Sequence, residues 1–166
     1  MLSISLIKKF YESFISDQLV FLISVDEDRI SGFVLGGDSY TITEIKKKFV
    51  RESFFRLFTY ILFSPKIYPQ ILSRLKISKK QEPQKEQVPT TSFRLLSIGV
   101  DSEYKRSGIG SALIKGFEER AKRMGVRSYG LSVYKTNEKA ISFYKKNDLK
   151  IEKETKNSLY FYKTLT

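Results

Sequence analysis

The segment from residue 96 to residue 114 constrains the fold more than any other part of the chain. It runs from an apolar stretch through a short polar loop into a Gly-x-Gly turn at Gly108 and Gly110, and then into an amphipathic pattern. A strand, turn and helix of this kind expose unpaired backbone N–H groups at the start of the helix, where the helix dipole favours an anion. Neither glycine carries a Cβ atom, so a phosphate can approach the main chain closely. The segment therefore predicts a binding site for a phosphorylated ligand.

Two common nucleotide-binding motifs do not fit this turn. A dinucleotide-binding fingerprint needs a third glycine where this chain has Leu113, and it follows an early strand, whereas this turn lies in the second half of the chain. A P-loop needs Gly-Lys-Ser/Thr after four intervening residues, and Ser111 and Lys115 do not supply that order. The turn alone therefore does not identify the ligand.

Two blocks of sequence resemble the GCN5-related N-acetyltransferase (GNAT) superfamily. The range 100–114 is similar to the loop with which that family binds the pyrophosphate of coenzyme A, an Arg/Gln-x-x-Gly-x-Gly/Ala pattern after a strand. The range 137–149 is similar to the family's Asn-x-x-Ala-x-x-Phe-Tyr-x-x-x-Gly-Phe segment. The two blocks follow each other in the family's order, separated by a helix and the strand-like run 128–134. The resemblance is clear over residues 92–166, fainter over 19–37 and absent between them.

The resemblance implies a fold, a co-substrate and an activity. The fold is of the α/β (α+β) class, with a mixed, mostly antiparallel central sheet flanked by helices. The co-substrate is acetyl-CoA, and in the family the backbone of the strand before the loop pairs with its pantetheine arm. The cofactor-binding residues that the resemblance implies are Ile98, Val100, Lys105, Arg106, Ser107, Gly108, Ile109, Gly110, Ser111, Asn137 and Phe143.

Tyr144 is the catalytic residue that the resemblance implies. In the family this tyrosine protonates the departing thiolate of coenzyme A, and a purely structural aromatic in the core is the alternative. Lys105 stands where the family has Arg or Gln, and Arg106 stands where it often has Gly. Either cation could reach a phosphate, and a solvated surface charge is the alternative for both. Asp148 replaces a family glycine and tolerates the left-handed backbone that a helix end often needs.

Composition sets further bounds. With 166 residues, of which 41% are hydrophobic and 14% aromatic, the chain is expected to form one globular domain. It has no Cys and no His, which excludes a disulfide framework, Ser-His-Asp and Cys-His catalysis and His-ligated zinc, so we expect no metal. The central strand offers Arg94 and Ser97 but no carboxylate, and the general base therefore stays unassigned.

We expect a cytoplasmic protein. The chain has no run of about 18 apolar residues that could span a membrane. Its first nine residues place their lysines after their apolar residues, which is the reverse of a secretory signal. The cytoplasm is also where coenzyme A is plentiful. We expect the protein to be a monomer or a homodimer.

The net charge of +12 is concentrated between residues 41 and 91, which hold eleven Lys and Arg against four Asp and Glu. A solvated basic face on amphipathic helices is the simpler interpretation. The alternative is attraction to an anionic partner, such as a membrane surface, a phosphorylated sugar carrier or nucleic acid. Of these partners, nucleic acid is the one we do not expect.

Sequence patterns predict the N-terminal elements. The family usually has one more strand before its first helix, and we expect that edge strand to be missing or displaced here. Thr43 is the predicted cap of a long helix that starts a basic helical insertion over residues 41–91 of the single domain. The predicted elements are a helix over 3–16, strands over 19–25 and 30–35 ended by Gly36–Ser39, helices over 44–63 and 69–75, and a polar loop over 78–89.

The C-terminal elements follow from helix caps and alternation. Gly125 is expected as the left-handed C-cap of the cofactor helix, and Asn137 as the N-cap of the last helix. The predicted elements are a helix over 107–124, a strand over 126–134, a helix after Asn137, and a hairpin of strands over 149–155 and 159–165.

Three hypotheses for function remain open. The first is an acetyl-CoA-dependent N-acetyltransferase in which a primary amine attacks directly in a ternary complex. The second is a non-catalytic acyl-CoA-binding module, and the third is a binder of anionic membrane or nucleic acid through the basic insertion. The insertion falls where the family builds its acceptor pocket, and it looks similar to insertions in acetyltransferases of bacterial surface-polysaccharide synthesis. An amino sugar or another small amine is therefore the expected acceptor.

Overall fold

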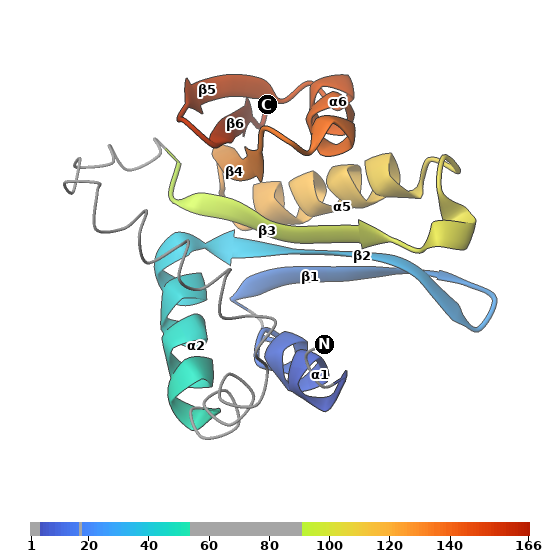
Figure 1. The fold of residues 1–166 in the computed structure, drawn as a ribbon, viewed down its shortest axis with the longest axis vertical. Coiled ribbons are helices and arrows are strands. Elements are labelled where there is room, and N and C mark those ends of the chain that lie inside the picture. Colours follow the sequence, from blue (N-terminus) through green and yellow to red (C-terminus); the bar gives the residue numbers. More distant parts are fainter. Residues whose placement is uncertain (1–3, 17, 54–90) are drawn as a thin grey trace. The chain divides into compact units, whose positions relative to one another are not determined.

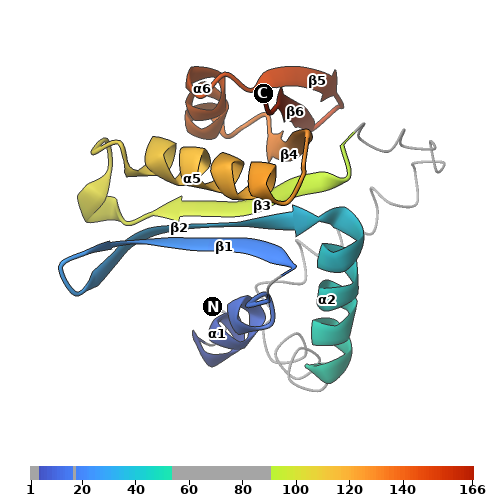
Figure 2. The same cartoon turned by 180° about the vertical axis from the view of Figure 1, so that it is seen from behind.

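The computed structural model describes residues 4–16, 18–53 and 91–166 of the chain (Figure 1). Figure 2 shows the same ribbon from behind. Its helices and strands are, in order, α1 (Ile4–Glu12), β1 (Leu19–Asp26), β2 (Arg29–Asp38), α2 (Ser39–Glu52), β3 (Phe93–Val100), the short 3₁₀ helix η2 (Ser102–Tyr104), α5 (Ile109–Arg123), β4 (Ser128–Tyr134), α6 (Glu138–Lys146), β5 (Lys150–Glu154) and β6 (Ser158–Thr164).

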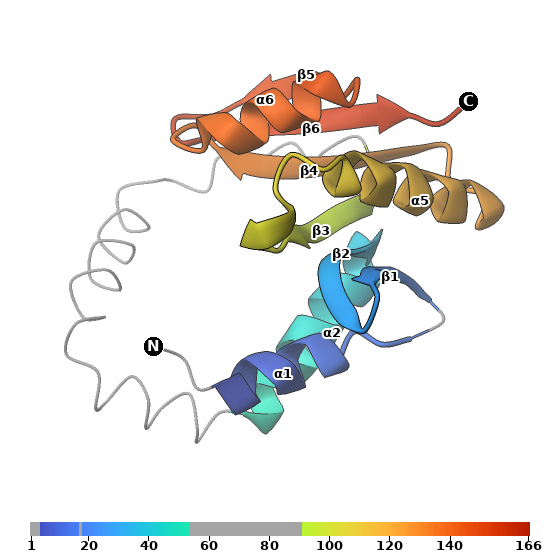
Figure 3. The ribbon, with the colours of Figure 1, turned by 90° about the vertical axis from the view of Figure 1, so that its right-hand side faces the viewer.

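The strands form one six-stranded sheet in the order β1-β2-β3-β4-β6-β5. Neighbouring strands are antiparallel except β3 and β4, which are parallel. Helices α5 and α6 lie on the same face of this sheet (Figure 3). The ring of Phe117 on α5 contacts that of Tyr129 on β4, and Tyr144 on α6 contacts Phe161 on β6. The prediction of a mixed, mostly antiparallel sheet flanked by helices is confirmed.

The sheet opens into a fork between β3 and β4. β3 pairs with β2 at seven positions, from Phe93 to Val100, but it pairs with β4 at one position only, Arg94 with Gly130. A register shift leaves Leu96 without a partner in β2, and a bulge of this kind bends a strand and increases its twist. Beyond Arg94 the two strands therefore separate, and one edge of β3 is left without a neighbouring strand.

Helix α5 packs across β1, β2 and β3. It ends in a Schellman motif, in which the N–H of Val126 donates to the C=O of Ala121 at 3.0 Å. Gly125 has a φ of 77°, so the predicted left-handed C-cap is confirmed. The side chains that α5 buries recur at helical spacing and form the centre of the core: Leu113, Ile114, Phe117 and Ala121.

Two glycines that were expected to end β2 lie inside it. The strand continues to Asp38. A Cβ atom at Gly36 would lie 2.6 Å from Cε2 of Phe117, and one at Gly37 would collide with the side chain of Leu19. The predicted end of the strand is therefore wrong, because these glycines allow close packing rather than a turn. Other boundaries move by a few residues, and within the described residues no strand precedes α1.

The chain's contacts divide it into two compact units, which we describe separately. One comprises Met1–Ser13 and Glu44–Val88, and the other comprises Phe14–Thr43 and Pro89–Thr166. In the first unit, the rings of Phe10 and Phe49 meet edge to face, with their centroids 5.2 Å apart. The second unit contains the whole sheet, α5 and α6. The expectation of a single domain stays a prediction.

Helix α2 begins earlier than predicted. The carboxylate of Asp38 accepts hydrogen bonds from the N–H groups of Tyr40 at 2.9 Å and Thr41 at 3.2 Å, so Asp38 is the cap. The expected cap, Thr43, instead donates its hydroxyl to the C=O of Ser39 inside the helix. The rest of the predicted insertion, residues 54–90, lies outside the described residues. No helix in the part that the structure describes is both long and apolar enough to cross a membrane.

Candidate functional site

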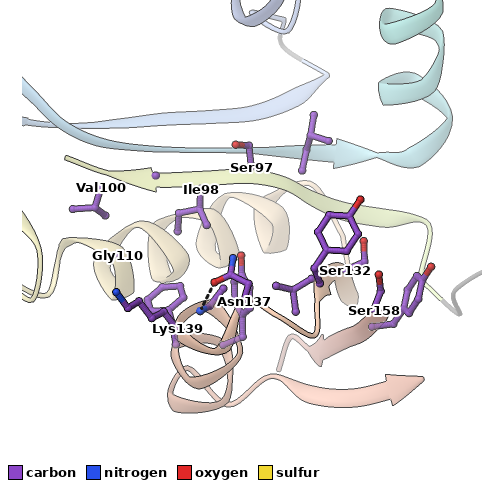
Figure 4. Close-up of a pocket in the computed structure, with 16 residues that line it drawn as sticks. Ser97, Ile98, Val100, Gly110, Ser132, Asn137, Lys139 and Ser158 are labelled. Atoms are coloured by element: carbon purple, nitrogen blue, oxygen red, sulfur yellow. Dashed lines mark hydrogen bonds between the residues drawn. The ribbon is translucent and has the colours of Figure 1, made fainter. Parts of the chain in front are cut away.

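A cleft of about 750 Å³ opens in the fork between β3 and β4. Figure 4 shows residues of β3, of the start of α5 and of α6 around it. Six of the predicted site residues line it together, namely Ile98, Val100, Gly110, Asn137, Phe143 and Tyr144. The other lining residues are Leu96, Ser97, Gly99, Ser132, Val133, Tyr134, Lys139, Ala140, Ser158 and Tyr160.

The backbone of β3 presents two residues to the fork. The N–H of Asp101 donates to the C=O of Ser31 at 2.9 Å, so residue 101 belongs to a hydrogen-bonded pair with β2. Hydrogen-bonded and non-hydrogen-bonded pairs alternate along antiparallel strands. The N–H and C=O groups of Ile98 and Val100 consequently point away from β2, towards the side where no residue of β4 pairs with them. Both residues can therefore pair with an extended ligand as a neighbouring strand would.

The start of α5 presents free N–H groups to the same region. Gly108 is the N-cap, with a φ of 90°, and no side chain caps the helix. Its C=O accepts the first helical hydrogen bond, from Ala112 at 3.0 Å. Among the described residues, the N–H groups of Ile109, Gly110 and Ser111 have no acceptor. Free N–H groups at the start of a helix and the helix dipole both favour an anion, so the geometry is compatible with the predicted phosphate site, which stays a prediction.

Gly110 lies where β3, α5 and α6 meet. A Cβ atom at this position would lie 3.1 Å from Cε2 of Phe143 and 3.7 Å from Cγ2 of Val100. Any side chain here would therefore press on Phe143 and narrow the cleft. The absence of a Cβ at this position allows α5 and α6 to approach each other and keeps the cleft open.

The loop before α5 lies beside the cleft rather than in its wall. Arg106 has a φ of 67°, a left-handed conformation that glycine adopts more readily than arginine does. The side chains of Lys105 and Arg106 are exposed, and the hydroxyl of Ser107 donates to the C=O of Tyr104 at 2.6 Å. The side chain of Ile109 packs against the core. The predicted residues that do not line the cleft are Lys105, Arg106, Ser107, Gly108, Ile109 and Ser111.

Tyr144 reaches the cleft from the buried face of α6. Its side chain is largely buried, and its ring lies 5.4 Å from that of Phe143 and 5.9 Å from that of Phe161, centroid to centroid. Burial raises the pKa of the Tyr144 hydroxyl above its ordinary value of 10. The phenol is consequently protonated at neutral pH, which is the form that a proton donor needs.

Asn137 combines a structural contact with a place in the cleft. Its side-chain oxygen accepts a hydrogen bond from the N–H of Ala140 at 3.2 Å, so the predicted N-cap of α6 is confirmed. The same side chain lines the cleft. The cap fixes its oxygen and leaves its NH₂ group available to an acceptor.

The opposite wall of the cleft was not predicted. Its polar side chains come from strands, and in the register of β4 with β6 Ser132 lies opposite Tyr160, and Tyr134 lies opposite Ser158. These four side chains point to the face of the sheet that α5 and α6 do not cover, because side chains alternate along a strand. Alternation marks such positions in the sequence, but it does not say which strands are neighbours.

A polar network fixes α5, β4, β6 and the end of α6 to one another. The hydroxyl of Tyr129 donates to Glu118 at 2.8 Å, and Lys163 Nζ lies 2.8 Å from the same carboxylate oxygen. Lys163 also donates to the C=O of Asn147, just after α6, at 3.0 Å. Burial and the Glu118 carboxylate both raise the pKa of Tyr129. This network stabilises the helix that carries Tyr144.

Residues 76–148 match the family described as Acetyltransferase (GNAT) family. The match contains the predicted pyrophosphate loop and most of the predicted second block, including Asn137 and Tyr144. A comparison with curated proteins gives no match.

Solved structures share the fold. The ribosomal-protein-S18-alanine N-acetyltransferase from Escherichia coli superposes with a TM-score of 0.57 at 14% identity, over 96% of this chain and 77% of that one. A Bacillus anthracis protein described as a streptothricin acetyltransferase, solved with acetyl coenzyme A, gives a TM-score of 0.58 at 14% identity, over 95% and 69%. The PaiA N-acetyltransferase from Thermoplasma acidophilum, solved with coenzyme A, gives 0.54 at 17% identity, over 89% and 61%. At these identities the structures establish the likeness of fold.

Proposed function

We propose that this chain, of which residues 76–148 match the Acetyltransferase (GNAT) family, is an acetyltransferase that transfers the acetyl group of acetyl-CoA to a primary amine by direct attack in a ternary complex. One observation carries the proposal. The free edge of β3 at Ile98 and Val100 and the uncapped start of α5 border one cleft, and they offer hydrogen-bonding groups that the described protein does not use. An extended amide chain ending in a pyrophosphate matches both features.

The main chain does most of the binding in this proposal. The N–H groups of Ile109, Gly110 and Ser111 donate to the pyrophosphate, and the helix dipole favours its charge. The backbones of Ile98 and Val100 pair with the amides of the pantetheine arm, and the NH₂ group of Asn137 donates to the same arm. Lys105 and Arg106 add positive charge at the exposed end of the site.

Tyr144 is the proposed catalytic acid. As the amine nitrogen bonds to the acetyl carbon and the C–S bond breaks, the Tyr144 hydroxyl gives its proton to the departing sulfur. The raised pKa of the Tyr144 hydroxyl keeps that proton in place until the thiolate forms. A backbone N–H on the free edge of β3 stabilises the oxyanion of the tetrahedral intermediate.

The acceptor enters from the wall formed by β4 and β6, where Ser132, Ser158 and Tyr160 offer hydroxyl groups. Hydroxyl and aromatic groups suit a polar small amine, and an amino sugar is the acceptor that we propose to test first. From the sequence we also propose a cytoplasmic location. We further propose that the basic insertion makes a peripheral contact with an anionic surface.

The first experiment is calorimetric titration of the purified protein with acetyl-CoA and with free coenzyme A. We expect micromolar binding of both, and binding should be lost when Gly108 and Gly110 are replaced by bulky residues. An assay of thiol release with a panel of amino-sugar nucleotides and simple amines then identifies the acceptor. Binding of acetyl-CoA without turnover of any amine would favour a non-catalytic acyl-CoA-binding module. No binding at all would contradict the proposal.

A further inference from the structure

A cation that was not among the predicted site residues lines the cleft. Lys139 belongs to the first turn of α6 and is one of the residues that form the cleft wall. Among the described residues of that wall it is the only Lys, Arg, Asp or Glu. The part of the cleft that the structure describes therefore carries one positive charge and no carboxylate to oppose it.

The contact between α6 and the start of α5 brings Lys139 to the uncapped end of α5. A Cβ atom at Gly110 would lie 3.1 Å from Cε2 of Phe143, so the face of α6 that carries Phe143 meets the first turn of α5. Lys139 precedes Phe143 by four residues and lies on the same face of α6, about 6 Å away along the helix axis. Figure 4 shows its side chain extending towards Gly110.

The ammonium group of Lys139 makes no ion pair in the described part of the chain. Its side chain is exposed, and none of the ion pairs among those residues includes it. Lys163, by contrast, is held by the carboxylate of Glu118. A cation that no carboxylate neutralises attracts an anionic ligand, and the walls of a cleft strengthen that attraction.

The two cations that the sequence predicted are less well placed. Lys105 and Arg106 are exposed and lie outside the cleft lining. The same loop also contains Asp101 and Glu103, so the formal charges of residues 101–106 cancel. The charge that faces a ligand in the cleft therefore comes from α6 rather than from the loop before α5.

We propose that Lys139 binds the pyrophosphate of the donor and makes the cleft select phosphorylated thioesters over unphosphorylated ones. This inference rests on the proposed function, because it assigns a residue to the co-substrate named there. The N–H groups at the start of α5 give the phosphates directed hydrogen bonds, and the Lys139 ammonium adds a full charge. An ammonium group on a flexible four-carbon stem binds phosphate as a point charge and needs no fixed geometry.

The test measures the Kd of three ligands in wild type, K139Q, K139E and K139R. Acetyl-CoA carries the pyrophosphate and the 3′-phosphate, acetyl-dephospho-CoA keeps only the pyrophosphate, and S-acetylpantetheine has neither. Calorimetry serves the first two ligands, and competition against acetyl-CoA serves the third. The matched control is K145Q, which removes the same charge from the same helix at an exposed position outside the cleft lining. K105Q and R106Q test the predicted cations.

We expect K139Q to raise the Kd for acetyl-CoA and for acetyl-dephospho-CoA equally, by about tenfold. K139E should raise both further, and K139R should stay within about threefold of wild type because it keeps the charge. The Kd for S-acetylpantetheine should be the same in all four proteins. K145Q should bind acetyl-CoA within about twofold of wild type. Added salt should weaken acetyl-CoA binding more in wild type than in K139Q, because salt screens the lost interaction.

Equal Kd values for acetyl-CoA in K139Q and wild type would overturn the proposal, as would a larger loss in K105Q or R106Q than in K139Q. A loss with acetyl-CoA but not with acetyl-dephospho-CoA would overturn the assignment to the pyrophosphate. An equal loss with S-acetylpantetheine would overturn it in favour of a structural role. If the wild-type protein binds none of the three ligands, the proposed function fails and this inference fails with it. If it binds acetyl-CoA and K139Q binds equally well, this inference alone fails.

Discussion

The two edges of β3 differ in what they bond to. Towards β2 the strand is paired at seven positions, and towards β4 it is paired at one. The paired edge belongs to the core, where Gly36 and Phe117 pack against each other. The other edge borders a cleft of about 750 Å³. One strand is therefore part of the core on one side and borders the proposed binding cleft on the other, and changes on the two sides should separate stability from binding.

The largest effect is expected on the paired edge. In G36V, the new Cβ would lie 2.6 Å from Phe117 and would also press on the backbone of Arg94. We expect overpacking to lower the free energy of unfolding by about 3 kcal/mol, which corresponds to a fall in melting temperature of about 6–12 °C for a chain of this length.

The control for G36V is G116A in α5. A Cβ at Gly116 would lie 3.2 Å from Cδ1 of Leu22, the mobile end of a side chain that can move aside. We expect G116A to change the free energy of unfolding by less than about 1 kcal/mol. Equal stability of G36V and wild type in thermal or urea denaturation would contradict the close packing of the paired edge.

The next effect is expected at the fork. In G110V, the side chain would press on Phe143 and on Val100 and would narrow the cleft beside the pyrophosphate site. We expect the Kd for acetyl-CoA, measured by calorimetry, to rise about 100-fold, which is about 2.7 kcal/mol. The melting temperature without ligand should change little, and a fall as large as that of G36V would contradict the separation of the two edges.

The third prediction concerns Tyr144, which lines the cleft from α6 and whose proposed role in catalysis can be separated from its role in packing. Y144F removes the proposed acid but keeps the ring that packs between Phe143 and Phe161. We expect kcat to fall on the order of 10²-fold, with the Kd for acetyl-CoA and the melting temperature unchanged. Y162F, which removes a hydroxyl of β6 outside the cleft lining, is the control. A kcat of Y144F within twofold of the wild-type value would exclude Tyr144 as the acid.

The smallest effect concerns alkaline pH. The folded protein raises the pKa of Tyr129 and of Tyr144, chiefly through burial. Above pH 10 the unfolded chain loses these protons first, so the free energy of unfolding should decrease as pH rises. Each tyrosine contributes at most about 1.4 kcal/mol per pH unit. Urea denaturation between pH 9 and pH 11 should show a shallower decrease in Y129F than in wild type, and an equal slope would contradict the assignment.

The sequence predicted elements whose ends depend on local chemistry. Gly125 and Asn137 end and begin their helices as expected, and Asp148 has a φ of 63°, the left-handed backbone expected of it. These features need only neighbouring residues, because caps and left-handed turns are short-range structures.

The sequence could not predict features that arise from contacts between distant segments. A pair of glycines such as Gly36 and Gly37 suggests a turn in the sequence. In the structure both lie inside a strand, because Phe117 packs where a Cβ of residue 36 would be and Leu19 packs where a Cβ of residue 37 would be. Thr43 and Asp38 are both good caps, and the choice of Asp38 follows from where β2 ends. Ser132 and Tyr160 lie opposite each other only because β4 and β6 are neighbours in the sheet. Six of the predicted residues line the cleft on the side of β3, α5 and α6, whereas no lining residue of β4 or β6 was predicted.

The proposed binding of acetyl-CoA in the fork would also link the stability of the protein to the concentration of that ligand. In that proposal an acetyl-CoA molecule pairs with the free edge of β3 as a missing strand would, and it binds the folded chain but not the unfolded one. At a concentration 100 times its Kd, such a ligand adds about 2.7 kcal/mol to the free energy of unfolding. Resistance to proteolysis should therefore rise and fall with the acetyl-CoA concentration.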